Sequence, residues 1–477
     1  MFLTENDLPE TSYGLNHFDR NVTLQRFLKR YYSEFLEREQ NNLSELAFFC
    51  AGELNNQADY NDRTAPPRLE YSLDCLHAPN RRVTRVLLNE RYKDAQQELY
   101  RRGAIAKGFK KGPSNQPSRE QIFAFLTQYL SSYTDISTGC PLAMSHPDAL
   151  ILAERAPENI RERFLGQFLR CDGRTMIGGT WATEWAGGSD VRGNTESRAE
   201  LTDPETGECR VTGRNFFSSA LGFESWGAIK TVRMPDGKNK DDLALVFIPR
   251  FTDEKWDAPE HEREENSVSF SYLKQKSGTR GLATGEVEMD KAQGWLVAPP
   301  GHGLRAMMQV LAGSRVHNAI ASAGVMHRAY NDALCWVTGR ETFGKKLITR
   351  PDIQADLTWL QNKENQLWQR VITALAKYWT AEKATQCTAL ATETIGGTAY
   401  TTDHPMERIN RDAMVLRVWE GPKNIQSREL GQLLSAGASD LVIDRLEAVI
   451  ATLEHESLDS DKNGLKELIT CLKSALE

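Results

Sequence analysis

The sequence predicts an α+β multidomain protein, in which an N-terminal helical domain precedes a central antiparallel β-barrel and a C-terminal helical bundle. Apolar residues recur at helical spacing up to about residue 170, where glycines become dense and short alternating runs replace the helical pattern. The helical period returns from Gly303. We therefore expect domains at residues 1–170, 171–295 and 296–440, followed by an acidic amphipathic helical tail at 441–477.

Individual stretches support each part of this order. Helical spacing is clear at 24–39, 119–133, 304–340 and 367–397, and alternating or continuous apolar runs predict strands at 208–219, 243–251, 267–274 and 285–290. Between Gly344 and Gly396 the chain has room for only one long and one short helix. We expect the first helix of that pair to be the short one.

Composition gives no support for several classes of protein, although a local basic patch could still bind nucleic acid. A net charge of −7 gives no general attraction to nucleic acid, and no run of about 18 apolar residues predicts a membrane span. The N-terminal MFLTENDLPETSYG has acids and no arginine, which argues against a leader peptide. The eight cysteines are scattered without metal spacing. We expect reduced thiols, no metal site and a cytoplasmic location.

Two short stretches contain candidate functional residues. In VWEGPKNIQ, Glu420 lies between Trp419 and Gly421, directly before Pro422, which prevents a regular helix. Such a glutamate is usually a solvated residue at a helix end. In WATEWAGGSDV, residues 181–191, the glycines and small hydroxyls suit a loop that brings backbone N–H groups to a planar polar ligand, although Gly-Ser-Asp also forms ordinary turns.

Five motifs, in order, resemble those of the acyl-CoA dehydrogenase family of flavoproteins, and the resemblance covers about residues 120–435. KSGTRGLATGEVEM (276–289), GCPLAMS (139–145) and the residue after WEG are most similar to the AidB-like branch. The motifs are WATEWAGGSD (181–190), VTGRNFFSS (211–219), GRETFG (339–344), IGG (395–397) and RINRDAMVLRVWEG (408–421).

The resemblance implies an FAD-dependent oxidoreductase that introduces a double bond next to the carbonyl of an acyl-CoA or similar activated acid. Glu420 would be the base that removes the α proton, while a hydride passes to flavin N5. Trp419, Gly421 and Arg315 would lie at the substrate, although Arg315 could equally be a solvated helix residue. Water-excluding surroundings would raise the pKa of Glu420 toward neutral pH.

The resemblance also implies the residues that bind FAD. Thr183 and Ser219 would hydrogen-bond the flavin ring beside Ala182, Phe217 would cover one of its faces, and Gly188 and Ser189 would let the backbone approach it. Arg340, Phe343, Gly396 and Gly397 would meet the adenosine and pyrophosphate of an FAD bound mainly to a neighbouring subunit. A shared cofactor implies a homodimer or homotetramer. Taken singly, Phe217 could be a core residue and Arg340 a charge that favours a helix C-terminus.

Three residues depart from the family pattern. Ala312 replaces an aspartate, Pro422 replaces a threonine, and Glu393 replaces a glutamine that contacts FAD in many members. Recognition of ordinary CoA is therefore in question. Two further functions stay open: an AidB-like flavoprotein that acts mainly by binding nucleic acid or lipid, and a related flavin oxidation in a biosynthetic pathway. The acidic tail disfavours DNA, and the sequence indicates neither the substrate nor the electron acceptor.

Overall fold

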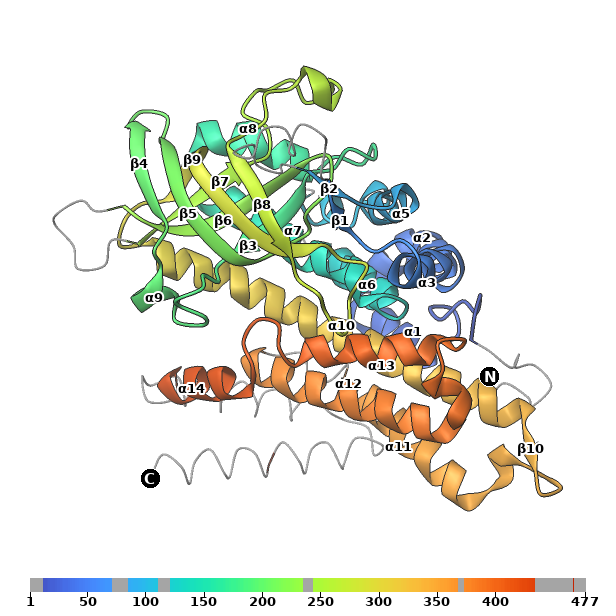
Figure 1. Cartoon of the computed structure of the whole chain (residues 1–477). Helices are drawn as coiled ribbons and strands as arrows, with labels where there is room; N and C mark the ends of the chain where they lie inside the picture. The colour runs from blue at the N-terminus through green and yellow to red at the C-terminus, as the bar shows by residue number, and fades with distance from the viewer. Residues whose placement is uncertain are drawn as a thin grey trace.

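The computed structural model describes residues 12–70, 85–109, 121–234, 243–367, 373–433 and 466. Helices, then a sheet, then helices follow one another along the chain, as the sequence predicts (Figure 1). The proposed division into domains remains a prediction. The tail at 441–477 lies outside the described residues, except Lys466.

The N-terminal part is helical apart from a two-residue strand pair, β1 with β2. The run predicted at 24–39 is divided at Tyr32, whose backbone is not helical (φ −142°, ψ 39°). Asp135 caps α7 by accepting hydrogen bonds from the N–H groups of Ser137 and Thr138. The elements are α1 Val22–Tyr31, α2 Ser33–Phe49, a π-helical turn Cys50–Leu54, α3 Asn55–Arg63, β1 Arg68–Leu69, β2 Val86–Leu87, α5 Glu90–Arg101, a 3₁₀ turn Ala106–Phe109, α6 Ile122–Ser132, α7 Ile136–Arg155 and α8 Glu158–Phe168.

The central sheet has seven strands, and its pairings close on themselves because β6 pairs with both β7 and β4. Most pairings are antiparallel, as expected, but β3 and β4 each run parallel to β6. The strand predicted at 208–219 has those bounds in the structure. The elements are β3 Ile177–Trp181, α9 Val191–Asn194, β4 Arg198–Asp203, β5 Glu208–Ser219, β6 Trp226–Arg233, β7 Leu243–Pro249, a 3₁₀ turn Glu260–Glu262, β8 Val268–Leu273 and β9 Thr284–Ala298.

The C-terminal part is arranged around α10, a helix of 37 residues that is buried on most of its surface. Helix α11 has 17 residues and α12 has 23, which agrees with a short first helix in this pair. The elements are α10 Gly303–Gly339, β10 Glu341–Thr342, β11 Lys345–Lys346, a 3₁₀ turn Leu347–Thr349, α11 Pro351–Leu367, α12 Thr373–Ile395, a 3₁₀ turn Gly397–Tyr400, α13 Pro405–Leu416 and α14 Lys423–Leu433.

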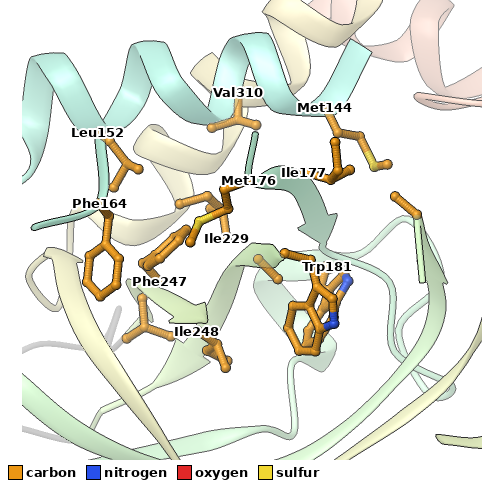
Figure 2. Packing of buried hydrophobic residues seen from close by; sticks show 14 of the residues in the cluster. Met144, Leu152, Phe164, Met176, Ile177, Trp181, Ile229, Phe247, Ile248 and Val310 are labelled. Carbon is orange, nitrogen blue, oxygen red and sulfur yellow. The ribbon is translucent and has the colours of Figure 1, made fainter. Parts of the chain in front are cut away.

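Helices α7 and α10 pack on the sheet and hold it against the rest of the molecule. Figure 2 shows Met144 and Leu152 of α7 and Val310 of α10 in one apolar cluster with Phe247 and Ile248 of β7. Burial on both faces explains why β7 is continuously apolar instead of alternating. A second cluster joins α10, α12 and α13 to the N-terminal helices, and Trp419 packs against both clusters.

Candidate active site

Glu420 lies in a strained turn between α13 and α14. Its φ is +56°, in the left-handed region that non-glycine residues rarely adopt, and Gly421 follows with φ +96°. The carbonyl of Glu420 accepts hydrogen bonds from Arg315 Nε (3.2 Å) and Gln426 Nε2 (2.6 Å). The carbonyl of Gly421 accepts one from Lys377 Nζ (2.9 Å). Three side chains from α10, α12 and α14 therefore hold this turn.

The surroundings of Glu420 place its titration close to neutral pH. Desolvation raises the pKa of Glu420 to about 7, and the charges of Arg315 and Lys377 partly oppose that rise. Desolvation also lowers the pKa of Lys377, which is 1% exposed, to about 8. Arg315 is 7% exposed, so its interpretation as a solvated helix residue is wrong. Glu420 itself is half-buried, so it is not the fully solvated residue that is usual at a helix end.

A second group of polar side chains lies at the ends of β5 and β9. Ser219 Oγ lies 3.0 Å from Thr284 Oγ1, which also accepts a hydrogen bond from Lys276 Nζ at 3.0 Å. Desolvation lowers the pKa of Lys276 to about 8. Desolvation raises the pKa of the Cys140 thiol to about 12. Glu420 adds to this rise, while Lys276 and a hydrogen bond with Ser219 oppose it. Cys140 of α7 thus lies close to Ser219 and to Glu420.

An exposed aromatic surface lies next to this polar group. Phe217, two residues before Ser219 on the same face of β5, is 47% exposed, so its interpretation as a core residue is wrong. Phe216 N donates to Thr183 O at 2.9 Å, which brings the loop after β3 alongside β5. The ring of Trp185 packs edge-on against Phe216, with 4.5 Å between centroids, and Trp185 is 78% exposed.

These residues fit a flavin ring. An exposed aromatic ring, that of Phe217, beside two hydroxyls and an ammonium group complements a planar ring system that has a polar edge. Thr183 is half-buried beside them, and Ala182 packs against the apolar core below. Gly188, with φ +53°, and Ser189 are exposed on the same loop.

The remaining cofactor candidates lie at the opposite end of α10. Arg340 directly follows α10, and its guanidinium lies 4.2 Å from the centroid of Trp336. Phe343, between β10 and β11, is 97% exposed, and Gly396 and Gly397 follow the end of α12. Helix α10 spans roughly 55 Å at its length of 37 residues. Figure 1 shows β10 far from the sheet, so one chain does not bring this group to Phe217 and Ser219.

Several residues of the site were not predicted from the sequence. Lys276, Lys377 and Gln426 contact the site, although motif positions alone gave them no role. For Lys377 a signal was present, because a single lysine lies between apolar residues in the helical run LAKYW. Among the described residues, no cluster of histidine, cysteine or carboxylate side chains could hold a metal ion.

Comparison with known proteins shows what this chain is similar to. Residues 301–367 and 355–434 match the family model of the acyl-CoA dehydrogenase C-terminal domain. The two stretches overlap within the short helix α11. The family model and the relatives below show that the chain is similar to acyl-CoA dehydrogenases. Members of this family bind FAD.

Individual relatives extend the similarity beyond that domain. The putative acyl-CoA dehydrogenase AidB of Escherichia coli is 28% identical over 292 residues, which are 56% of this chain and 51% of AidB. Acyl-CoA dehydrogenase family member 11 of Caenorhabditis elegans is 25% identical over 455 residues, covering 86% of this chain and 70% of that protein. The match to AidB therefore spans about half the length of AidB.

The fold is also shared with a solved structure. The structure of Caenorhabditis elegans ACDH-11 in complex with C11-CoA has a TM-score of 0.83 and 21% identity to this chain, covering 98% of this chain and 82% of that one. The similarity to AidB agrees with the AidB-like features of the sequence. Within the described residues, no helix is both long and apolar enough to cross a bilayer.

Proposed function

We propose that this protein is an FAD-dependent dehydrogenase that oxidises the Cα–Cβ bond of an acyl-CoA or similar activated acid. The observation that supports it best is Glu420, a carboxylate held in a strained turn, with a pKa near 7. A general base is most effective when its pKa lies near the working pH. The complex of ACDH-11 with C11-CoA supports an acyl-CoA as the substrate class.

The chain's own residues supply the proton transfer and the positioning. Glu420 accepts the α proton of the substrate, and the buried positive charges of Arg315 and Lys377 keep enough of it ionised to act as a base. Its backbone N–H is our candidate donor to the thioester carbonyl, where negative charge develops as the proton leaves. When bound, FAD supplies the acceptor for the hydride that leaves Cβ.

We propose that FAD lies between two copies of this chain. Thr183, Phe217 and Ser219, with Ala182, Gly188 and Ser189, would hold the ring of FAD in one copy. Arg340, Phe343, Gly396 and Gly397 of a second copy would meet its adenosine and pyrophosphate, because they lie at the other end of α10. The protein would then work as a homodimer or homotetramer. Trp419 and Gly421 would border the substrate.

Replacement of Glu420 by glutamine tests this function. Glu420→Gln keeps the shape and the backbone of the turn, so FAD should still bind, while reduction of the flavin by substrate should slow by about 10²- to 10⁴-fold. Stopped-flow absorbance measures this under anaerobic conditions with a panel of acyl-CoAs. The control is Glu382→Gln, which removes the carboxylate that pairs with Arg417 2.9 Å away on the protein surface.

Two results would contradict the proposal. A purified protein that binds no added FAD would remove its basis. Reduction of the flavin in Glu420→Gln at a rate close to that of the parent protein would show that another group takes the proton.

A further inference from the structure

Asn318, on the central helix α10, is a buried amide without a hydrogen-bond partner. It is 3% exposed, and neither its Nδ2 nor its Oδ1 has a partner among the described residues. A buried amide left unpaired is costly, so nearly all such groups in proteins have a partner. The amide therefore indicates a group that is bound there only when the protein works.

Neighbouring residues on α10 show which way Asn318 faces. The hydroxyl of Ser314 donates to the carbonyl of Ala143 on α7 at 2.9 Å. The next residue, Arg315, donates to the carbonyl of Glu420 at 3.2 Å. Residues three and four apart lie on the same side of a helix, so Asn318 follows Arg315 and Ser314 one turn along α10. It therefore lies on the side of α10 that contacts α7 and the Glu420 turn.

Helix α7 also lies close to the Glu420 turn. Cys140, one turn before Ala143, is close enough to Glu420 for that carboxylate to raise the pKa of its thiol. Other polar residues near Asn318 have protein partners: His317 Nδ1 lies 3.0 Å from Gln128 Oε1, and the Ser322 hydroxyl donates to the carbonyl of Asn318 at 2.9 Å. The unpaired amide is therefore not a general property of this part of α10.

We infer that Asn318 binds a polar group on the acyl chain of the substrate, a hydroxyl or an amide that can both donate and accept a hydrogen bond. This inference rests on the proposed function, in which the Cα–Cβ bond lies beside Glu420. The CoA end of a substrate must reach solvent, whereas Asn318 is buried. The side-chain amide of Asn318 therefore meets the acyl end of the substrate. One helical turn is about 5.4 Å, which places the polar group a few bonds beyond the α carbon.

This arrangement selects against a plain hydrocarbon chain. A hydrocarbon acyl group that fills the space leaves both atoms of the Asn318 amide unpaired and excludes water from them. A site that hydrogen-bonds a substrate hydroxyl strongly rejects an analogue without that hydroxyl. An apolar pocket rejects an added hydroxyl only weakly. The substrate class is therefore a hydroxylated or amide-bearing acyl thioester.

The test compares hexanoyl-CoA with its 4-, 5- and 6-hydroxy derivatives. Calorimetric titration of the FAD-loaded protein should give at least one hydroxyhexanoyl-CoA a dissociation constant about 10- to 100-fold below that of hexanoyl-CoA, as expected for one buried hydrogen-bond pair. In Asn318→Leu, the ratio of the dissociation constant of hexanoyl-CoA to that of the hydroxy derivative should fall to about one or below one. Ser322→Ala, one turn further along α10, should leave the ratio unchanged. If Asn318→Leu does not fold, Asn318→Ala serves for the same comparison.

Thermal unfolding gives a second measurement that needs no substrate. Because Asn318→Leu removes an unpaired buried amide, it should raise the melting temperature of the ligand-free protein. A lower melting temperature for both Asn318→Leu and Asn318→Ala would show that the protein itself pairs the amide, and would overturn the inference.

The outcomes separate this inference from the proposed function. If acyl-CoAs reduce the flavin but hexanoyl-CoA binds at least as tightly as every hydroxy derivative, or Asn318→Leu leaves the ratio unchanged, only the inference fails. If no acyl-CoA in the panel binds or reduces the flavin, the proposed function fails and the inference fails with it.

Discussion

At Glu420 two effects act in opposite directions, and burial is the larger. Burial disfavours the charged carboxylate, while Arg315 and Lys377 favour it, and the result is a pKa of about 7. The same burial lowers the pKa of Lys377 to about 8. Near pH 7 to 8, a carboxylate and an ammonium group can therefore coexist, which is the state that proton abstraction requires.

Lys377→Met should move the pH dependence of flavin reduction to higher pH. The rate should rise with pH as Glu420 ionises, and loss of a cation that lowers the pKa of Glu420 should shift that rise upward, on the order of one pH unit. Stopped-flow reduction measured from pH 5.5 to 9 gives the profile. Lys377→Arg keeps the charge and should stay closer to the parent, and Lys383→Met, whose ammonium binds Gln386 on the surface, is the control. An unshifted profile in Lys377→Met would rule out this role.

At the scale of the elements, a buried network joins α13 to the N-terminal helices and the sheet. Arg408 of α13 is 1% exposed and donates to Asp59 of α3 at 2.7 Å. Its guanidinium also lies 3.6 Å from Asp135 and 3.4 Å from Asp412. Asp412 accepts a hydrogen bond from Thr279 N at 2.6 Å, in the loop that contains Lys276. One buried cation thus links the elements on both sides of the site.

Arg408→Met should destabilise the protein by about 3–5 kcal/mol, because it leaves buried carboxylates without their cation. Urea unfolding followed by circular dichroism measures the free energy of unfolding. Arg417→Met, at the end of the same helix, removes only the surface pair with Glu382 and should cost about 0–1 kcal/mol. If the two variants lose the same stability, the network does not hold α13 in place.

At the scale of the molecule, the length of α10 separates the two groups of cofactor candidates. Phe217 and Ser219 lie on β5 of the sheet, whereas Phe343 lies between β10 and β11, and Figure 1 shows β10 far from the sheet. The exposure of Phe343, at 97%, agrees with a side chain that another copy of the protein covers.

Coexpression of two defective chains should restore part of the activity. Glu420→Gln lacks the base, and the double variant Arg340→Ala/Phe343→Ser lacks the far group, so each alone should be nearly inactive. In a mixed dimer, one of the two sites combines both intact groups, which gives about a quarter of the parent activity if the chains pair at random. Differently tagged chains allow the mixed dimer to be purified and assayed. Absence of any recovery in that dimer would mean that each site is built from a single chain.

The amino-acid sequence by itself predicted the order of the structure and the motif residues. The strand at 208–219 and the helix at 304–340, found at Gly303–Gly339, follow from periodicity, because the alternation of apolar and polar residues within a few positions decides which local structure buries them. Glu420 could be chosen from its motif, but its pKa and its strained backbone could not.

Only the tertiary structure decided what surrounds those residues. Lys377 and Gly421 are 44 positions apart, Arg315 and Glu420 are 105 apart, and Arg408 and Asp59 are 349 apart. Local sequence patterns act over a few residues, whereas burial of a charge and the choice of its partner depend on which distant helices pack together. For the same reason, the unpaired amide of Asn318 and the separation of the two cofactor groups along α10 became apparent only in the folded chain.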